Sequence, residues 1–332
     1  MERLGITIGL EGASLQEAID LCLHAEELGY TDVWSAEVGG ADGVAALAPV
    51  AAQTSRVRLG TAILPVFTRP PALLAMGAAT LQNLSEGRFV IGLGTSSPVI
   101  VGSWMGGSFD RPLTRLREYV EVLREALSGK KVSYQGETVS LEGFRLQLDP
   151  GTPVPIYLAA LGPKACRLAG EVADGVIFFL KTPRGVRQGL EWVAEGARAA
   201  GRDPADLDCV IRVTAAVDED PEVLRFVSRR LVTTYAAVAV YNRSLILQGF
   251  EKEATAIATA WAAGDREAAT EAVSDRLLDE LLITGSAEQC RQGLADFRAA
   301  GVKTPVLLPV SVAGDPAERI ERVGGAVAAL AP

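Results

Sequence analysis

Few side chains in this sequence are of the types that carry acid–base or nucleophilic chemistry near neutral pH. The only histidine is His24, which lies about 180° around its predicted helix from the apolar face and should therefore point to solvent. We accordingly expect neither a histidine general base nor a nucleophilic triad. The cysteines are too widely separated to predict a zinc site or a disulfide framework, so we expect small, reduced core residues. They are Cys22, Cys166, Cys209 and Cys290.

One carboxylate and one glycine–proline pair deserve a functional interpretation because of where they lie. Glu37 immediately follows a predicted strand, where a catalytic role and an ordinary solvated loop position fit equally well. Gly162 and Pro163 end a later strand and open a helix. Free backbone N–H groups at such a helix start can bind an anion. An ordinary turn between strand and helix explains the same pair, and spacing alone favours that second interpretation.

Two features of the segment after residue 89 invite a cofactor interpretation. Gly92-Leu-Gly94 resembles the start of a dinucleotide-binding fingerprint, but the third glycine is missing. The loop that follows runs for about 18 residues, whereas a fingerprint turns directly into its helix. We therefore do not predict a dinucleotide site here. Trp104 lies in this Gly- and Ser-rich loop, where it either walls a pocket or caps the core beneath it.

The elements that must position these residues alternate regularly between strand and helix. Eight apolar runs have the length and β-branched content of buried strands, and nearly all are followed by a helical pattern. The predicted strands are 5–10 (Gly5 to Leu10), 31–36, 58–65, 89–94, 154–159, 175–180, 208–216 and 304–310. The predicted helices are 14–29, 43–54, 71–84, 113–127, 163–172, 184–200, 286–300 and 316–330.

Eight such units predict an α/β fold, a (β/α)8 TIM barrel, over residues 1–332 as one domain. The alternation of strand and helix is interrupted by a short β segment at about 130–150 and a helical stretch at about 220–282. Both are interpreted as insertions, after strands four and seven. A doubly wound sheet shares the alternation but rarely carries eight strands in one series. In a barrel the active site forms where the strands end, which is where Glu37 and Gly162 lie.

Composition excludes several classes of partner. The 32 Lys and Arg residues are outnumbered by 41 Asp and Glu residues, and a net charge of −9 repels nucleic acid. No apolar run reaches the ~18 residues of a membrane span, and no signal peptide precedes the first strand. We expect a cytoplasmic protein without a metal site. A barrel with neither a metal nor an acid–base histidine suits an organic cofactor that carries the chemistry itself.

Several segments resemble the bacterial luciferase-like monooxygenase family, in the order in which that family carries them. They are 32–37 (DVWSAE), 54–63 (TSRVRLGTAI), 84–95 (LSEGRFVIGLGT), 158–164 (LAALGPK), 169–175 (AGEVADG) and 285–310. The resemblance covers nearly the whole chain. Within the family, GTSSP at 94–98 and AALGP at 159–163 are most similar to the branch that uses coenzyme F420, a deazaflavin. Other branches use reduced FMN and oxygen.

The resemblance implies a (β/α)8 barrel with the cofactor ring lying across the C-terminal mouth. It implies a non-proline cis peptide behind the ring, and the aligned bond is Ala62–Ile63. The implied cofactor-binding residues are Glu37 at the polar end of the ring, Ala62, Ile63, Thr95 and Ser96 around it, and Ala160, Leu161, Gly162 and Pro163 near the phosphate. The family also implies a homodimer, for which the Ala-rich helix from Val44 to Ala52 offers an apolar face.

Two departures from the family pattern concern the proton partner. Val38 stands where relatives often carry a histidine, and Ser97-Pro98 stands where sugar-phosphate-reducing relatives place a catalytic glutamate. The candidate catalytic residues are therefore Glu37 and Ser97, and a sugar phosphate is not the expected substrate. Trp104 and Phe178 are the candidates for the wall of a substrate pocket.

The resemblance therefore predicts an F420-dependent oxidoreductase that transfers a hydride to or from a small organic molecule. An FMN-dependent monooxygenase is the alternative within enzymes. A flavin-binding barrel without catalytic activity is the alternative outside them.

Overall fold

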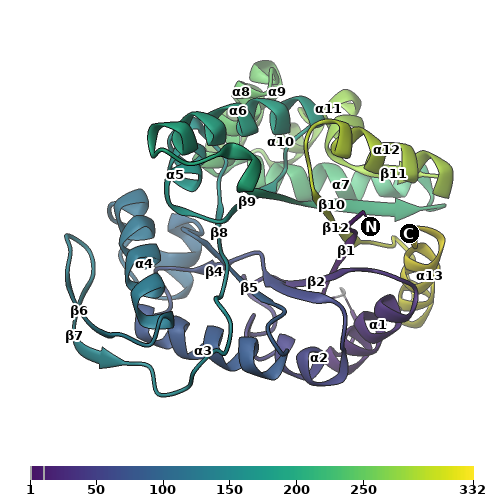
Figure 1. Ribbon diagram of the computed structural model, residues 1–332. Coiled ribbons are helices and arrows are strands. Elements are labelled where there is room, and N and C mark those ends of the chain that lie inside the picture. Colours follow the sequence, from purple (N-terminus) through teal and green to yellow (C-terminus); the bar gives the residue numbers. More distant parts are fainter. Residues whose placement is uncertain (1, 10–11) are drawn as a thin grey trace.

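A closed barrel of eight parallel strands forms the centre of the molecule in the computed structural model, which describes residues 2–9 and 12–332 (Figure 1). The predicted strand end at Leu10 lies outside the described residues. The strands are β1 (Gly5–Thr7), β2 (Asp32–Ser35), β3 (Arg58–Thr61), β5 (Phe89–Gly94), β8 (Ile156–Ala159), β9 (Gly175–Phe179), β10 (Asp208–Val217) and β12 (Thr304–Pro309). Pairing of β9 with β10 closes the ring, which confirms the predicted barrel.

Eight helices alternate with these strands and pack outside the barrel (Figure 1). They are α1 (Leu15–Glu27), α2 (Leu47–Gln53), α3 (Pro71–Leu84), α4 (Pro112–Leu127), α5 (Pro163–Val172), α6 (Pro183–Ala199), α12 (Ala287–Ala299) and α13 (Pro316–Ala329). Capping boxes begin α1 at Ser14 and α12 at Ser286. Proline occupies the first turn of α3, α4, α5, α6 and α13, where its missing N–H is harmless.

Both predicted insertions are present. The first is an antiparallel hairpin of β6 (Lys131–Gln135) and β7 (Ser140–Arg145), which extends away from the barrel beside α4 (Figure 1). The second contains α7 (Pro221–Ala236), α8 (Ala239–Leu247), α9 (Glu251–Ala262), α10 (Arg266–Glu271) and α11 (Asp275–Leu281). A short strand that was not predicted, β11 (Ile283–Gly285), follows them and pairs with β10.

Large apolar side chains fill the barrel interior. Trp34, Tyr157, Val90, Val210 and Val306 belong to one buried cluster that is separate from the layer between the strands and the helices. The Trp34 ring occupies the space opposite residue 60, where a Cβ atom would lie 2.3 Å from the ring. Glycine at position 60 therefore makes room for the tryptophan.

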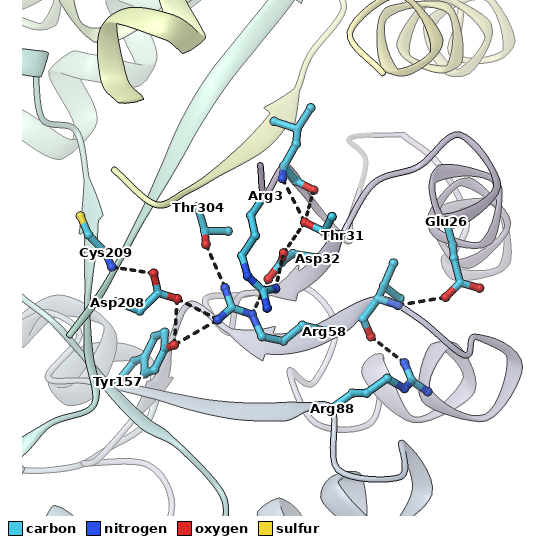
Figure 2. Close-up of polar contacts among 12 residues, drawn as sticks. Arg3, Glu26, Thr31, Asp32, Arg58, Arg88, Tyr157, Asp208, Cys209 and Thr304 are labelled. Carbon is cyan, nitrogen blue, oxygen red and sulfur yellow. Dashed lines mark hydrogen bonds and ion pairs between the residues drawn. The ribbon is translucent and has the colours of Figure 1, made fainter. Parts of the chain in front are cut away.

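The N-terminal end of the barrel is closed by a polar cluster centred on Arg58 (Figure 2). Its guanidinium donates to Asp32 Oδ1 at 2.5 Å, to Asp208 Oδ2 at 2.7 Å and to Thr304 Oγ1 at 3.0 Å. Tyr157 adds a hydrogen bond from its hydroxyl to Asp208 at 2.8 Å. We call these five residues the Arg58 cluster. They join β2, β3, β8, β10 and β12, so that side-chain contacts reinforce barrel closure.

Local differences from the predicted elements lie close to the mouth. The predicted strand 58–65 is two strands, β3 and β4 (Leu64–Pro65), separated by two residues. The predicted loop after β5 contains a π-helix, Val99–Trp104. The helix predicted at 43–54 begins at Leu47, because Asp42 accepts the N–H groups of Val44 and Ala45 in a turn before it.

Two other predictions can be compared with the structure directly. All four cysteines are free and buried, as expected of core residues. His24 lies on the outside of α1, where it contacts Glu27. Within residues 2–9 and 12–332, none of the helices combines the length and the apolar character that crossing a bilayer requires.

Candidate active site at the barrel mouth

The segment between β3 and β4 forms one side of the mouth. The Ala62–Ile63 bond is a cis peptide, as the resemblance implies. The Ala62 N–H donates to the Ser35 carbonyl at 2.6 Å, and the Glu37 N–H donates to the Ile63 carbonyl at 3.3 Å. The Ile63 side chain is partly exposed, whereas Ala62 is buried at the top of the barrel interior. This segment thus presents an apolar wall at the mouth, held by hydrogen bonds from β2 and the residues that follow it.

Glu37 lies at the mouth and is paired with an arginine. Arg69 donates through Nε to Oε1 at 3.0 Å and through Nη2 to Oε2 at 2.5 Å, and the Gly43 N–H donates to Oε2 at 3.1 Å. Arg69 also pairs with Asp42. The hydrogen bonds that Arg69 donates to Glu37 raise the pKa of its guanidinium above the ordinary value. Arg69 is therefore the partner of Glu37, which could not be identified from the sequence.

The turn before α5 has the geometry of an anion site. Gly162 is the N-cap residue of α5, and no heavy atom lies within 4 Å of the position that its Cβ would occupy. In the part of the chain that the structure describes, the N–H groups of Lys164 and Ala165 have no hydrogen-bond acceptor. Ala160 is buried in the strand end, while Leu161 and Pro163 are partly exposed beside the glycine. Two unpaired N–H groups therefore face an open space at a helix start.

The residues after β5 differ in how far their side chains are exposed at the mouth. Thr95 and Ser96 are partly exposed, and Ser96 has a left-handed backbone with φ of 58°. Ser97 is only 7% exposed, and its hydroxyl oxygen accepts the N–H of Ile100 at 3.3 Å. That contact stabilises the first turn of the π-helix. It gives Ser97 a structural role and does not support the catalytic role considered above.

The two residues expected to line a substrate pocket have different positions. Trp104 ends the π-helix and is 59% exposed at the rim, next to Gly39 of the loop after β2. Phe178 is fully buried in the layer between barrel and helices, where it packs against Gly189 of α6 and lies 5.4 Å from the Lys181 ammonium. The expectation for Phe178 does not hold, because alternate residues of a strand face opposite sides. Its neighbour Phe179 faces the mouth instead.

An arginine and three aromatic side chains that were not predicted from the sequence lie at the opposite side of the mouth. Arg212 of β10 points into the barrel and lies 5.5 Å from the centre of the Phe179 ring. Phe179, Tyr235 of α7 and Tyr241 of α8 meet edge to face, with centroid distances between 5.1 and 6.4 Å. Burial lowers the pKa of Arg212 and raises that of Tyr241. The available signal was an arginine in the middle of a strand, between the apolar residues Ile211 and Val213.

A comparison with known proteins places this arrangement in a family. The family model for luciferase-like monooxygenases matches residues 2–304. This protein belongs to the luciferase-like monooxygenase family. A Mycobacterium tuberculosis protein provisionally named a coenzyme F420-dependent oxidoreductase is 30% identical to it, over 92% of this chain and 94% of that protein. The 5,10-methylenetetrahydromethanopterin reductase of Methanolobus tindarius is 29% identical, over 90% and 92% of the two chains.

The fold of the chain is also similar to that of a solved structure. The coenzyme F420-dependent tetrahydromethanopterin reductase of Methanopyrus kandleri superposes with a TM-score of 0.80, at 25% identity and 97% coverage of both chains. The family membership and the barrel therefore agree with the resemblance seen in the sequence motifs.

Proposed function

We propose that this protein is a coenzyme F420-dependent oxidoreductase, which transfers a hydride between the deazaflavin and a small organic substrate. The single observation that carries the proposal is the presence of an apolar wall and an open helix start at one mouth. One is the apolar wall formed by Ile63 at the cis peptide, and the other is the open helix start at Gly162. The F420-dependent relatives support the choice of deazaflavin over FMN.

The residues at the mouth fit such a cofactor. Lys164 and Ala165 would bind the phosphate through their unpaired N–H groups, and Ile63 would support one face of the ring. Thr95 and Ser96 are exposed enough to contact the edge of the ring. When bound, the deazaflavin supplies the hydride chemistry, so no protein side chain has to carry electrons.

The Glu37–Arg69 pair would orient the polar end of the ring. Its two charges are held together by a bidentate contact, and each side chain is only 14% exposed. A carboxylate fixed in this way accepts a hydrogen bond in a constant direction. We therefore assign Glu37 to binding and orientation.

Titration with the two cofactors tests this proposal. F420 and FMN are added separately to the purified protein, and binding is followed by fluorescence. We expect binding of F420 only, followed by a change in deazaflavin absorbance on incubation with a substrate panel. Binding of FMN only would support the monooxygenase instead, and binding of F420 without turnover on any substrate would support a non-catalytic flavin-binding barrel.

Two variants make the titration specific to the mouth. Ile63→Asp places an unpaired carboxylate behind an apolar ring face and should abolish F420 binding. His24→Ala removes a solvent-facing side chain of α1 and should leave both binding and turnover unchanged. Loss of turnover in His24→Ala with normal F420 binding would contradict the proposed site.

We also propose that the protein is a homodimer of the cytoplasm. The four free, buried cysteines support a reducing compartment. Helix α2 buries Leu47 and Val50 in its own barrel but leaves Ala48 and Pro49 partly exposed and Ala52 exposed. Leu73 and Met76 are exposed on the adjacent helix α3. Light scattering at micromolar concentration should give twice the chain mass of 34.9 kDa; a mass near 34.9 kDa would contradict the dimer.

A further inference from the structure

Arg212 carries a positive charge inside the barrel, where the neighbouring side chains are mostly apolar. Its neighbours across the sheet are Phe179 on β9 and Val306 on β12. Val210, two residues earlier on the same strand, lies in the barrel interior beneath it. The side chain reaches across the mouth to the cis peptide segment, where Nη1 donates to the Ala62 carbonyl at 3.2 Å. The guanidinium therefore lies at the floor of the mouth, half-buried.

The hydrogen-bonding partners of Arg212 are all neutral. In addition to the hydrogen bond from Nη1 to the Ala62 carbonyl, the Nε atom of Arg212 donates to Thr7 Oγ1 at 3.4 Å. Among the described residues, Nη2 has no acceptor, and no carboxylate lies within 4.0 Å of the guanidinium. A guanidinium carries five N–H donors, and burying a charge without a counter-charge is unfavourable. With respect to residues 2–9 and 12–332, Arg212 thus retains free donors and an uncompensated charge.

A second arginine in the same barrel provides an internal comparison. Arg58 also points inward, but at the N-terminal end, and it pairs with Asp32 and Asp208. The described part of the barrel therefore supplies two carboxylates to the arginine at its closed end and none to the arginine at its mouth. A purely structural role for Arg212 would call for the same compensation. The difference indicates that the counter-charge at the mouth comes from a ligand.

Aromatic rings define the shape of the space beside this charge. Phe179, Tyr235 and Tyr241 come from three different elements, and all three are partly exposed. Two of these elements, α7 and α8, belong to the second insertion. Rings that meet edge to face leave ring surfaces available for an apolar or aromatic ligand. The charge and the rings together describe a site for a carboxylate attached to a planar apolar body.

We propose that Arg212 binds a carboxylate of the substrate, so that the enzyme acts on aromatic or unsaturated carboxylic acids packed against Phe179, Tyr235 and Tyr241. This inference rests on the proposed function, because it concerns the substrate side of the same mouth. The cofactor phosphate has its own donors at the start of α5 and does not require Arg212. Arg212 is a substrate-binding residue in this account.

Benzoate and benzamide serve as the probes, because they share a ring and differ in charge. Binding is measured by calorimetry, with and without F420. Charge-assisted hydrogen bonds predict that the parent binds benzoate at least about tenfold more tightly than benzamide. Arg212→Met should reduce the preference to within about twofold. The matched control is Arg230→Met, which changes an exposed arginine on α7 and should retain the full preference.

The possible outcomes separate this inference from the proposed function. Equal affinity of the parent for the two probes, or a preference that survives Arg212→Met, would overturn the inference alone. Weaker F420 binding in Arg212→Met with unchanged benzoate binding would make Arg212 a cofactor residue, which also overturns it. Arg212-dependent benzoate binding without any F420 binding would uphold the anion site and contradict the cofactor.

A structural measurement on the parent protein covers the case in which Arg212→Met does not fold. Crystals soaked with benzoate should show its carboxylate within hydrogen-bond distance of Arg212 Nη2 and its ring against Phe179. Density for benzoate elsewhere, or none at a concentration that saturates the protein in solution, would contradict the inference.

Discussion

Glu37 and Arg69 are 32 residues apart in the sequence and form a bidentate ion pair at the mouth. The strand-end position of Glu37 could be predicted from the sequence, because strand ends meet at the mouth of any barrel. Its partner could not, because Arg69 lies in a different connection, between β4 and α3. The same limit applies to Arg212, whose proposed role depends on the absence of a carboxylate within 4.0 Å of its guanidinium among the described residues. Residue types could thus be predicted at this scale, but their partners could not.

Glu37→Gln tests whether this carboxylate orients the cofactor or moves a proton. The amide keeps the shape, loses the charge and leaves Arg69 with Asp42 alone. We expect F420 affinity to fall about three- to tenfold, with little change in the pH profile of turnover, because one charge-assisted contact is lost. The exposed Glu27→Gln variant serves as control. Loss of one limb of the pH profile in Glu37→Gln would instead identify Glu37 as the proton partner.

The strands and helices were the features that could be predicted best from the sequence. All eight barrel strands and both insertions were predicted, because buried strands and amphipathic helices leave different periodicities. The prediction that Phe178 lines a substrate pocket was wrong for a physical reason. A barrel strand is apolar on both faces, so alternation cannot show which face a residue occupies. The π-helix was missed because its segment carries no helical period.

Two substitutions at Gly162 separate the anion site from the stability of α5. Gly162→Asp places a carboxylate beside the unpaired N–H groups and should weaken F420 binding at least about tenfold. Aspartate is a favourable N-cap residue, so the thermal unfolding temperature should be unchanged or higher. Gly162→Ala is the control, because φ at this residue is −114° and its Cβ would meet no atom within 4 Å. Equal F420 affinity in Gly162→Asp and the parent would contradict the phosphate assignment.

The Arg58 cluster supports the closure of the barrel, which is a property of the whole molecule. Its five residues span positions 32 to 304, so they join parts of the chain that are far apart in sequence. Burial opposes ionisation of Asp208, but Arg58 and the Tyr157 hydroxyl together lower the pKa of its carboxyl below the ordinary value. Such a carboxyl stabilises the fold above its unfolded-state pKa of about 3.9, and this contribution is lost as the pH falls through the folded-state pKa.

Asp208→Asn should therefore change acid stability in a defined direction. At neutral pH the variant should lose about 3 kcal/mol of unfolding free energy, because Arg58 loses one of its two buried partners. The difference from the parent should narrow as the pH falls below about 4, where the carboxyl of the parent becomes protonated. Urea unfolding over a pH series measures both. Asp20→Asn, at an exposed position on α1, should stay within about 0.5 kcal/mol of the parent. If the unfolding free energies of Asp208→Asn and the parent changed in parallel with pH, the predicted link between protonation of Asp208 and stability would be excluded.

A crystal structure of the protein with bound F420 tests the central claim most directly, because it locates both ends of the cofactor at once. The account predicts that the deazaflavin ring lies against Ile63 at the barrel mouth. It also predicts that the phosphate accepts hydrogen bonds from the N–H groups of Lys164 and Ala165. A ring bound away from Ile63, or a phosphate placed away from the start of α5, would contradict the account.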